Sequence, residues 1–213
     1  IYRYGKMTGN KSLIDFACMF DMPVRISCYH PYRSLLNIIS FKDCFSAYKY
    51  TAKNQEIMED IQVFIFRNKM HYFAIKGGYN RESHNHNDVG HFMLYEKDKP
   101  VIIDTGSDTY SKKTFSDERY TLWNMQSSYH NLPDIAGFAQ LAGSMYKAKN
   151  VIFDTNNRTV SLELKEAYPK EAGIISFIRK IEVKDEIIIV QDDISLDKQG
   201  YIEGHLMLLV EPV

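Results

Sequence analysis

Gln62-Val-Phe-Ile-Phe66 opens the part of the sequence that decides the fold. Three similar runs follow, each rich in β-branched and aromatic residues and each bounded by turn residues: His71-Tyr-Phe-Ala-Ile75, His91-Phe-Met-Leu-Tyr95 and Val101-Ile-Ile103. Residues of these types favour the half-buried surface of a β-sheet. From residue 61 onward, the sequence therefore predicts mostly strands.

Polar dipeptides between such runs predict hairpin turns. They are Lys97-Asp98, Asn156-Asn157 and Lys184-Asp185. Consecutive hairpins produce antiparallel sheets, and two stacked sheets can bury many strands in one core. We therefore predict a mainly β fold, an antiparallel β-sandwich.

The residues before this part follow a different pattern. From Lys11 to about Ala52, apolar residues recur at helical spacing, and Pro23 and Pro31 interrupt the run. We expect two or three short helices there, and divide the chain into a helical part, residues 1–52, and a sandwich, residues 53–213. Because the chain begins at Ile1 and its last residues are typical of a strand, we expect a piece of a longer protein, truncated at its C-terminus.

The composition limits the classes of partner. Hydrophobic residues make up 45% of the 213 residues and charged residues 25%, with a formal net charge of −1. This balance excludes a disordered chain and a basic nucleic-acid-binding protein. No apolar run approaches the roughly 18 residues that cross a bilayer, so we expect neither nucleic acid nor a membrane as partner. The cysteines have no metal-ligand spacing, and we expect buried thiols at Cys18, Cys28 and Cys44.

Residues 83–91, Ser-His-Asn-His-Asn-Asp-Val-Gly-His, contain three of the seven histidines. On an extended backbone alternate residues share a face, so His84, His86 and Asp88 would point the same way. Two imidazoles and a carboxylate at this spacing are typical of a metal or catalytic site, whereas a lone exposed histidine carries little information.

Two residues distant in sequence complete a possible ligand set. Pairing through the Lys97-Asp98 turn places opposite each other residues whose numbers add up to about 195, which brings Asp104 close to His91. His130 lies in a polar loop with no apolar face to explain it. Two histidines and one aspartate with an open position suit zinc. Asp104 could equally cap the turn before Gly106, and His130 could form a loop hydrogen bond.

Two other motifs share these residues. His84-x-His86-x-Asp88 begins the pattern of two-zinc hydrolases, but these enzymes need a further histidine where the sequence has Val89. His86-x-Asp88 with a distal histidine could form the facial triad of an iron enzyme, so a metal-dependent oxygenase of the jelly-roll type stays an alternative. The oxoacid-binding arginine of such enzymes is missing, however, because no arginine closely follows His130 or His205, the candidate distal histidines.

The motifs from Gly77 to Asn131, taken together and in this order, resemble the C-terminal domain of heparinase II/III-like polysaccharide lyases. They are Gly77-Gly-Tyr-Asn-Arg-Glu-Ser-His-Asn-His-Asn-Asp-Val-Gly-His-Phe92, Pro100-Val-Ile-Ile-Asp-Thr-Gly106, Arg119-Tyr120 and Ser128-Tyr-His-Asn131. The resemblance implies an α/α-toroid domain followed by a β-sandwich. Residues 1–52 would then be the last helices of the toroid and the linker.

The resemblance also implies a metal centre. His86, Asp104 and His130 match the zinc ligands of the family, whose single ion is mainly structural. Asp88 would support the centre by a hydrogen bond to a histidine or to a loop amide.

A second group of residues is assigned to the substrate by the same resemblance. His84 matches the histidine that faces the substrate and assists proton abstraction or neutralises the uronate. Tyr120 is assigned to proton transfer, and Arg119 and Asn85 to substrate binding. Tyr120 could instead be a packed edge aromatic, and Arg119 could pair with a nearby acidic residue.

These roles imply a lyase that cleaves a uronate-containing polysaccharide, a glycosaminoglycan or an alginate-like chain, by β-elimination. The proton removed lies α to a carboxylate, whose charge must be neutralised before a base can take the proton. Because most of the toroid is missing, we expect no activity from the chain alone. A non-catalytic carbohydrate-binding or structural module stays the alternative. The resemblance further implies a periplasmic or secreted protein and a possible homodimer.

Overall fold

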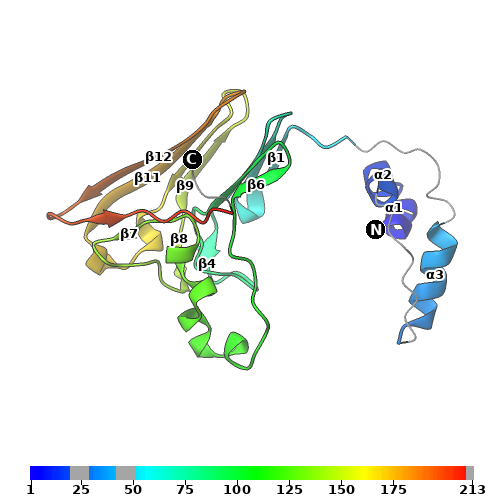
Figure 1. Cartoon of the computed structure of the whole chain (residues 1–213), viewed down its shortest axis with the longest axis horizontal. Helices are drawn as coiled ribbons and strands as arrows, with labels where there is room; N and C mark the ends of the chain where they lie inside the picture. The colour runs from blue at the N-terminus through cyan, green and yellow to red at the C-terminus, as the bar shows by residue number, and fades with distance from the viewer. Residues whose placement is uncertain (20–28, 42–50, 210–213) are drawn as a thin grey trace. The chain divides into compact units, whose positions relative to one another are not determined.

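A computed structural model describes residues 1–19, 29–41 and 51–209 (Figure 1). The chain divides into two compact units, Ile1–Ala52 and Lys53–Val213. The boundary lies where the sequence changes from helical to strand periodicity, and each unit is described here by itself.

Three helices make up the described part of the first unit: α1 (Tyr2–Thr8), α2 (Lys11–Met19) and α3 (Pro31–Phe41). The prediction of short helices from Lys11 onward is confirmed by α2 and α3, while α1 precedes them. Pro31 begins a helix rather than interrupting one, because the first helical residue needs no partner for its backbone N–H. Cys18 is only half-buried, contrary to expectation, and Cys28 and Cys44 lie outside the described residues. None of the described helices has the length and apolar character needed to cross a membrane.

The second unit contains a five-stranded sheet whose neighbouring strands are all antiparallel. In spatial order its strands are β1 (Gln55–Met58), β2 (Val63–Arg67), β3 (His71–Lys76), β5 (Phe92–Glu96) and β6 (Lys99–Ile102). The short 3-10 helix η2 (Glu59–Ile61) joins the first two strands.

A four-stranded antiparallel sheet forms the second layer. Its order is β12 (Ile188–Leu196), β11 (Ile174–Val183), β10 (Thr159–Glu163) and β9 (Lys149–Asp154). Two short pairs accompany the layers: β4 (Tyr79–Asn80) with β8 (Gly143–Lys147), and β7 (Asp134–Ile135) with β13 (Ile202–Glu203). The 3-10 helices η7 (Lys165–Ala167) and η8 (Lys170–Ala172) join β10 to β11.

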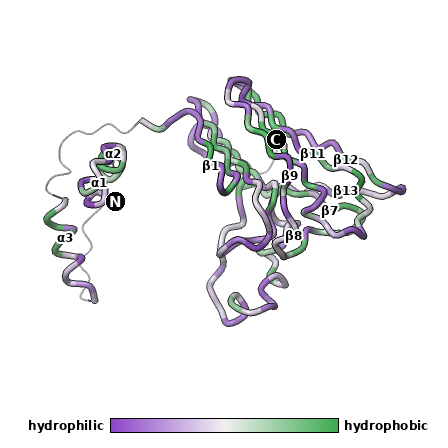
Figure 2. Tube along the Cα trace, turned by 180° about the vertical axis from the view of Figure 1, so that it is seen from behind, coloured by the Kyte–Doolittle hydropathy of each residue, from purple (hydrophilic) through white to green (hydrophobic). Residues whose placement is uncertain are grey.

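The two larger sheets share one hydrophobic core (Figures 1 and 2). In β2, Phe64 and Phe66 are buried in this core while Arg67 is only half-buried, the alternation expected of a sheet with one covered face. The ring of Phe64 stacks on that of Phe153 from β9, with centroids 6.1 Å apart. Phe177 of β11 is fully buried in the same core. The predicted antiparallel β-sandwich is therefore confirmed.

The three predicted hairpin turns are also confirmed. Lys97-Asp98 joins β5 to β6, and both residues have the positive φ, 46° and 64°, that suits the right-handed twist of a tight hairpin. Asn156-Asn157 joins β9 to β10, and Lys184-Asp185 joins β11 to β12.

Arg179 of β11 connects the four-stranded sheet to two loops, the one that precedes β5 and the one that precedes β7. Its guanidinium, 3% exposed, forms a two-pronged ion pair with Asp192 of β12 at 2.7 and 2.6 Å. Its third nitrogen donates to the carbonyl oxygens of Gly90 and Asn131, at 2.8 and 3.0 Å. One buried side chain therefore fixes the backbone of two separate loops.

Candidate functional site

Two loops meet at the end of the five-stranded sheet where β3 ends and β5 begins (Figure 1). We call residues 83–91 the histidine segment and residues 103–131 the long loop. The long loop contains four 3-10 helices: η3 (Lys113–Phe115), η4 (Asp117–Thr121), η5 (Trp123–Met125) and η6 (Ser127–Tyr129). Since both loops leave the same end of one sheet, residues far apart in sequence are brought together.

The histidine segment is not a strand, so the predicted extended backbone is wrong. Turns and bends run through it, and His84 has a φ of 59°, in the left-handed region. Burial nevertheless alternates, because Asn85, Asn87 and Val89 are buried while His86 and Asp88 are half-buried. Buried amide contacts, rather than a strand ladder, produce this alternation.

Gln140 supplies the central amide of these contacts. Its Oε1 accepts from Asn80 Nδ2 at 3.0 Å and from the Val89 N–H at 3.2 Å, and its Nε2 donates to the Val89 carbonyl at 2.8 Å. Asn80 Oδ1 accepts in turn from the Asp88 N–H. The backbone N–H of Gln140 donates to Ser127 Oγ of the long loop, so the same residue holds both loops.

His86, Asp104 and His130 converge as the sequence predicts. One potential ligand atom from each lies within 4.8 Å of the other two. His86 Nδ1 is 3.2 Å from His130 Nε2, and His130 Nδ1 is 3.0 Å from Asp104 Oδ2. The two contacts use different nitrogens of His130, and only one of them can bind a given ion. Ligand bonds of about 2.1 Å place tetrahedral ligand atoms about 3.4 Å apart, so binding of a zinc-sized ion requires these side chains to shift from the positions described.

The hydrogen-bonding pattern of this cluster calls for positive charge. Both ring nitrogens of His130 face oxygen acceptors, Asp104 Oδ2 and the Asn124 carbonyl, although a neutral imidazole has one N–H. His91 donates from Nδ1 to the His130 carbonyl at 2.6 Å, which leaves its Nε2 3.2 Å from the same Asp104 oxygen. That buried Nε2 has no hydrogen-bond partner. A cation bound between His130 and Asp104 would resolve the first of these conflicts.

The protonation states also suit a metal. Burial lowers the pKa of His86 and of His91 below the usual value of 6.5, so both rings favour the neutral form that can bind metal. Burial alone would raise the pKa of Asp104, but the His130 hydrogen bond and the nearby histidines outweigh it and lower that pKa. The carboxylate is therefore ionised at neutral pH.

A pocket of about 320 Å³ opens beside the cluster, and we call it the histidine pocket. Its lining includes Lys76, Glu82, His84, His86, Asp88 and Asp104. His84 is exposed there, in front of the half-buried His86. The structure thus places the predicted catalytic histidine and two predicted ligands around one opening.

Asp88 has a different partner from the one predicted. Its Oδ1 accepts from Lys76 Nζ at 2.9 Å, rather than from a histidine or a loop amide. Lys76 also contacts Glu82 at 3.3 Å. Burial alone would lower the pKa of Lys76, but the two carboxylates outweigh it and raise that pKa. Lys76 and Glu82 were not foreseen, because Lys76 lies outside the motifs and Glu82 was given no role within its motif.

Asn85, which lines the histidine pocket, forms a second group with Arg119 and Tyr120. Tyr120 donates its hydroxyl to Asn85 Oδ1 at 3.1 Å, and Arg119 donates to the Asn85 carbonyl at 2.5 Å. The Arg119 guanidinium lies 5.5 Å from the centre of the Tyr120 ring. The three predicted substrate-side residues are therefore neighbours, although 34 positions separate Asn85 from Arg119 in sequence.

The geometry disfavours the facial-triad alternative. That motif needs Asp88 beside His86 as a ligand, whereas Asp88 is paired with Lys76. The carboxylate that completes the cluster with His86 and His130 belongs to Asp104. The metal-dependent oxygenase reading therefore loses its ligand set.

Comparisons with known proteins agree with this arrangement. Residues 51–208 match the family model described as heparinase II/III-like, C-terminal. No curated protein matches the sequence. Among solved structures, a heparinase III, the BT4657 gene product, is 17% identical with a TM-score of 0.63, over 94% of this chain and 28% of that one. The heparan sulfate lyase HepC from Pedobacter heparinus is 17% identical with a TM-score of 0.60, over 91% and 30%.

The structural likeness, at this level of identity, establishes the fold, and the chain spans less than a third of the length of these two solved proteins. The family match covers most of the chain, including every residue of the histidine pocket. The chain therefore belongs to the heparinase II/III-like family, of which it matches the C-terminal domain.

Proposed function

We propose that this chain is the metal-binding sandwich of a polysaccharide lyase that cleaves a uronate-containing glycan by β-elimination. The observation that carries the proposal is His84, an exposed imidazole in a pocket whose wall includes His86 and Asp104, two members of the cluster completed by the buried His130. Family membership supports the reaction class. The solved relatives named above are a heparan sulfate lyase and a heparinase III, which makes a glycosaminoglycan the first substrate to test.

The residues of this chain can serve the chemistry in distinct ways. A substrate carboxylate in the histidine pocket would meet the His84 ring, and donation from that ring would lower the cost of forming charge beside the α-carbon. Arg119, which contacts Asn85 of the pocket lining, would supply a cation for a carboxylate or a sulfate. The Tyr120 hydroxyl is a proton donor or acceptor within the same group, once it leaves Asn85.

Zinc is the metal we propose, because two imidazoles and one carboxylate form a set that suits it. Bound to His86, Asp104 and His130, the ion would supply a fixed positive charge that holds the two loops together. His84 is two residues from His86, so this fixation would also position the catalytic ring. The ion has a structural role in this proposal.

The remaining context is proposed on the family resemblance alone. We propose a periplasmic or secreted enzyme, with the uronate polysaccharide as its partner and a homodimer as a possible assembly. The toroid side of the cleft would come from the rest of the protein. Activity is therefore expected only of the longer protein.

The decisive experiment compares the full-length enzyme with its His84→Asn variant on heparan sulfate and on alginate, by the ultraviolet absorbance of the unsaturated uronate product. Asparagine tolerates the left-handed backbone of His84, so the substitution removes the imidazole with little strain. We expect loss of at least about a hundredfold in kcat/KM, with metal content unchanged. His30→Ala, an exposed histidine of the first unit, is the matched control.

A non-catalytic carbohydrate-binding module is the competing function. It would bind the glycan and release no unsaturated product from any uronate polymer, even with the full-length protein loaded with metal. Full activity of His84→Asn would contradict the role assigned to His84.

A further inference from the structure

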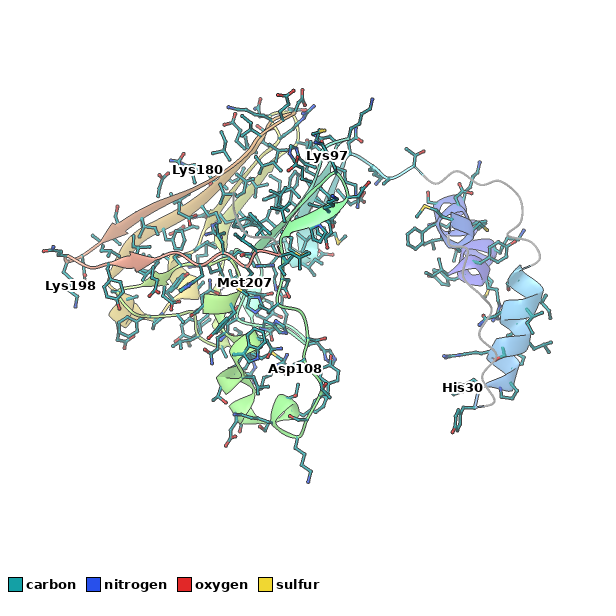
Figure 3. The ribbon with its side chains drawn as sticks, viewed as in Figure 1. His30, Lys97, Asp108, Lys180, Lys198 and Met207 are labelled. Atoms are coloured by element: carbon teal, nitrogen blue, oxygen red, sulfur yellow. The ribbon has the colours of Figure 1, made fainter. Side chains whose placement is uncertain are left out.

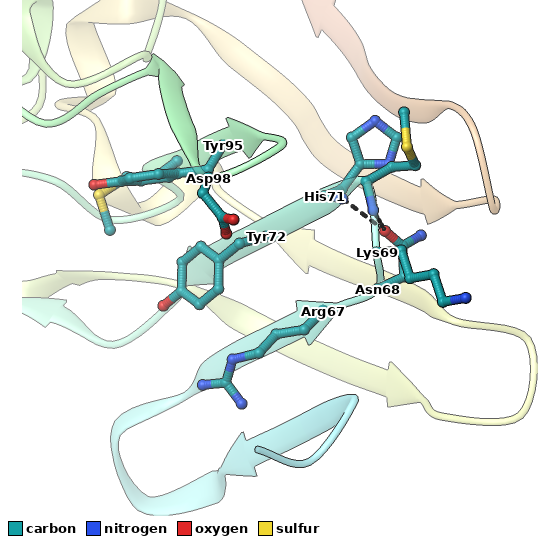
Figure 4. A pocket seen from close by; sticks show the side chains of 9 residues that line it. Arg67, Asn68, Lys69, His71, Tyr72, Tyr95 and Asp98 are labelled. Carbon is teal, nitrogen blue, oxygen red and sulfur yellow. Dashed lines mark hydrogen bonds between the residues drawn. The ribbon is translucent and has the colours of Figure 1, made fainter. Parts of the chain in front are cut away.

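A second pocket lies at the opposite end of the five-stranded sheet from the histidine pocket. Its volume is about 550 Å³, within the range of roughly 300–1,000 Å³ that is usual for small-ligand sites. Arg67, Lys69, Tyr72, Tyr95 and Asp98 are among its lining residues (Figure 4). We call it the tyrosine pocket.

Strand register explains why these side chains are neighbours. Arg67 pairs with Tyr72 across β2 and β3, and Tyr72 pairs with Tyr95 across β3 and β5. Phe66 and Phe73, the next residues along two of these strands, are buried in the core. The three pocket side chains therefore stand in one row on the outward face of the sheet.

This row is held in place before any ligand arrives. The Tyr72 and Tyr95 rings meet edge to face with centroids 5.6 Å apart. The Arg67 guanidinium lies 5.5 Å from the centre of the Tyr72 ring, and one of its nitrogens donates to the Lys53 carbonyl at 2.9 Å. The aromatic surface and the cation are therefore preorganised, which lowers the entropy cost of binding.

The charges of the pocket favour an anion. Arg67 and Lys69 contribute two positive charges and Asp98 one negative charge. Neither cation has an ion-pair partner among the described residues. A guanidinium with free N–H groups suits a carboxylate or a sulfate, while the Asp98 carboxylate can accept hydrogen bonds from hydroxyl groups.

We propose that the tyrosine pocket is a second, non-catalytic binding site for an acidic sugar residue of the polysaccharide. The tyrosine rings would pack against the apolar face of the sugar, Arg67 would bind its acidic group, and Asp98 would accept from its hydroxyls. The identity of this ligand rests on the proposed function, whereas the existence of the site rests on the pocket alone.

The two pockets can serve one chain of sugars. Tyr72 and Lys76 project from the same face of β3 and lie four residues apart, which corresponds to roughly 13 Å along the strand. Lys76 lines the histidine pocket and Tyr72 lines the tyrosine pocket. A short oligosaccharide spans this distance, so the tyrosine pocket would strengthen the binding of long substrates and leave small ones unaffected.

Calorimetric titration of this chain tests the site directly, with heparan sulfate and alginate hexasaccharides as acidic probes and cellohexaose as the neutral one. We expect Tyr72→Ala to weaken binding of an acidic probe about tenfold, and Tyr72→Phe to retain it. Arg67→Gln should abolish the preference for acidic over neutral probes. Lys180→Gln, which removes a cation from the outer side of the other sheet, is the matched control (Figure 3).

Equal affinity of wild type, Tyr72→Ala and Arg67→Gln for the acidic probes, or no binding to the wild type at all, would overturn the site. Failure of the lyase proposal looks different, because the full-length protein would then form no unsaturated product while Tyr72-dependent binding persists. If product forms and Tyr72→Ala affects neither binding nor turnover of long polymers, only the second site is wrong.

Discussion

The four-stranded sheet and the histidine pocket are built by different means. The sheet consists of consecutive antiparallel strands from β9 to β12, and buried residues alternate with exposed ones along β11. Apart from Lys76 at the end of β3, the pocket is built from loops, and buried polar groups such as Gln140 and Asn131 position its backbone. Apolar packing tolerates moderate substitutions, whereas each buried polar group left without a partner costs free energy. The pocket should therefore be the more sensitive of the two regions.

Arg179→Met is expected to have the largest effect, because Arg179 belongs to both regions. The substitution leaves the Asp192 carboxylate and the carbonyls of Gly90 and Asn131 without their donor. We expect a loss of about 3–5 kcal/mol in the free energy of unfolding, measured by urea titration. Lys180→Gln, its exposed neighbour, should change the value by less than about 0.5 kcal/mol. Similar losses for both variants would remove the distinction between the regions.

Zinc binding at the histidine pocket is expected to have the second-largest effect on the free energy of unfolding. With free zinc at a hundred times its dissociation constant, we expect the wild type to gain about 2.7 kcal/mol. The Asp104→Asn variant should gain little, since the carboxylate that joins the two histidines is lost. Thermal unfolding with and without zinc, after treatment with a chelator, measures both gains. Stabilisation of the variant equal to that of the wild type would place the ion elsewhere, and stabilisation by calcium instead of zinc would contradict the metal assignment.

Gln140→Leu tests whether the loops of the histidine pocket can open while the four-stranded sheet stays intact. The leucine fills a similar volume, but the N–H and the carbonyl of Val89 lose their partners. We expect a cost of about 1–3 kcal/mol and faster hydrogen exchange at the Val89 amide. Amides of β11 should exchange at an unchanged rate if the opening is local. Faster exchange in both places to the same degree would mean that the loops and the sheet unfold as one unit.

Lys76→Met is expected to have the smallest effect, and it carries a pH dependence. The pKa of Lys76 is raised by Asp88 and Glu82 above its ordinary 10.5. Its contribution to stability is therefore complete below pH 10.5 and is lost as the pH rises through the folded-state pKa. The wild type should exceed the variant by about 1 kcal/mol or less near pH 8, and the difference should shrink in strongly alkaline solution. A difference that grows with pH would contradict the assignment of this charge.

Most of the fold could be predicted from local patterns in the sequence. The sandwich and its hairpins were predictable because each hairpin turn lies beside the two strands that it joins. The register of one hairpin was enough to bring Asp104 toward His91, and their side chains lie 3.2 Å apart. The convergence of His86 and His130 was accessible from residue chemistry together with the family resemblance.

The positioning groups were not predictable from the sequence in the same way. Arg179 reaches Gly90 across 89 positions, and Gln140 reaches Val89 across 51. Nothing local distinguishes these two residues from other polar residues near strands. The left-handed backbone of His84 was also missed, because histidine does not demand that conformation as glycine does.

The backbone of His84 restricts how this position can change over time. At a φ of 59° asparagine and aspartate are tolerated best after glycine, whereas β-branched residues are strained. The codons for asparagine and aspartate each differ from those for histidine by a single base. A relative that has lost catalysis but kept the fold is therefore expected to carry asparagine or aspartate at this position, and such a sequence would mark a lineage that binds its glycan without cutting it.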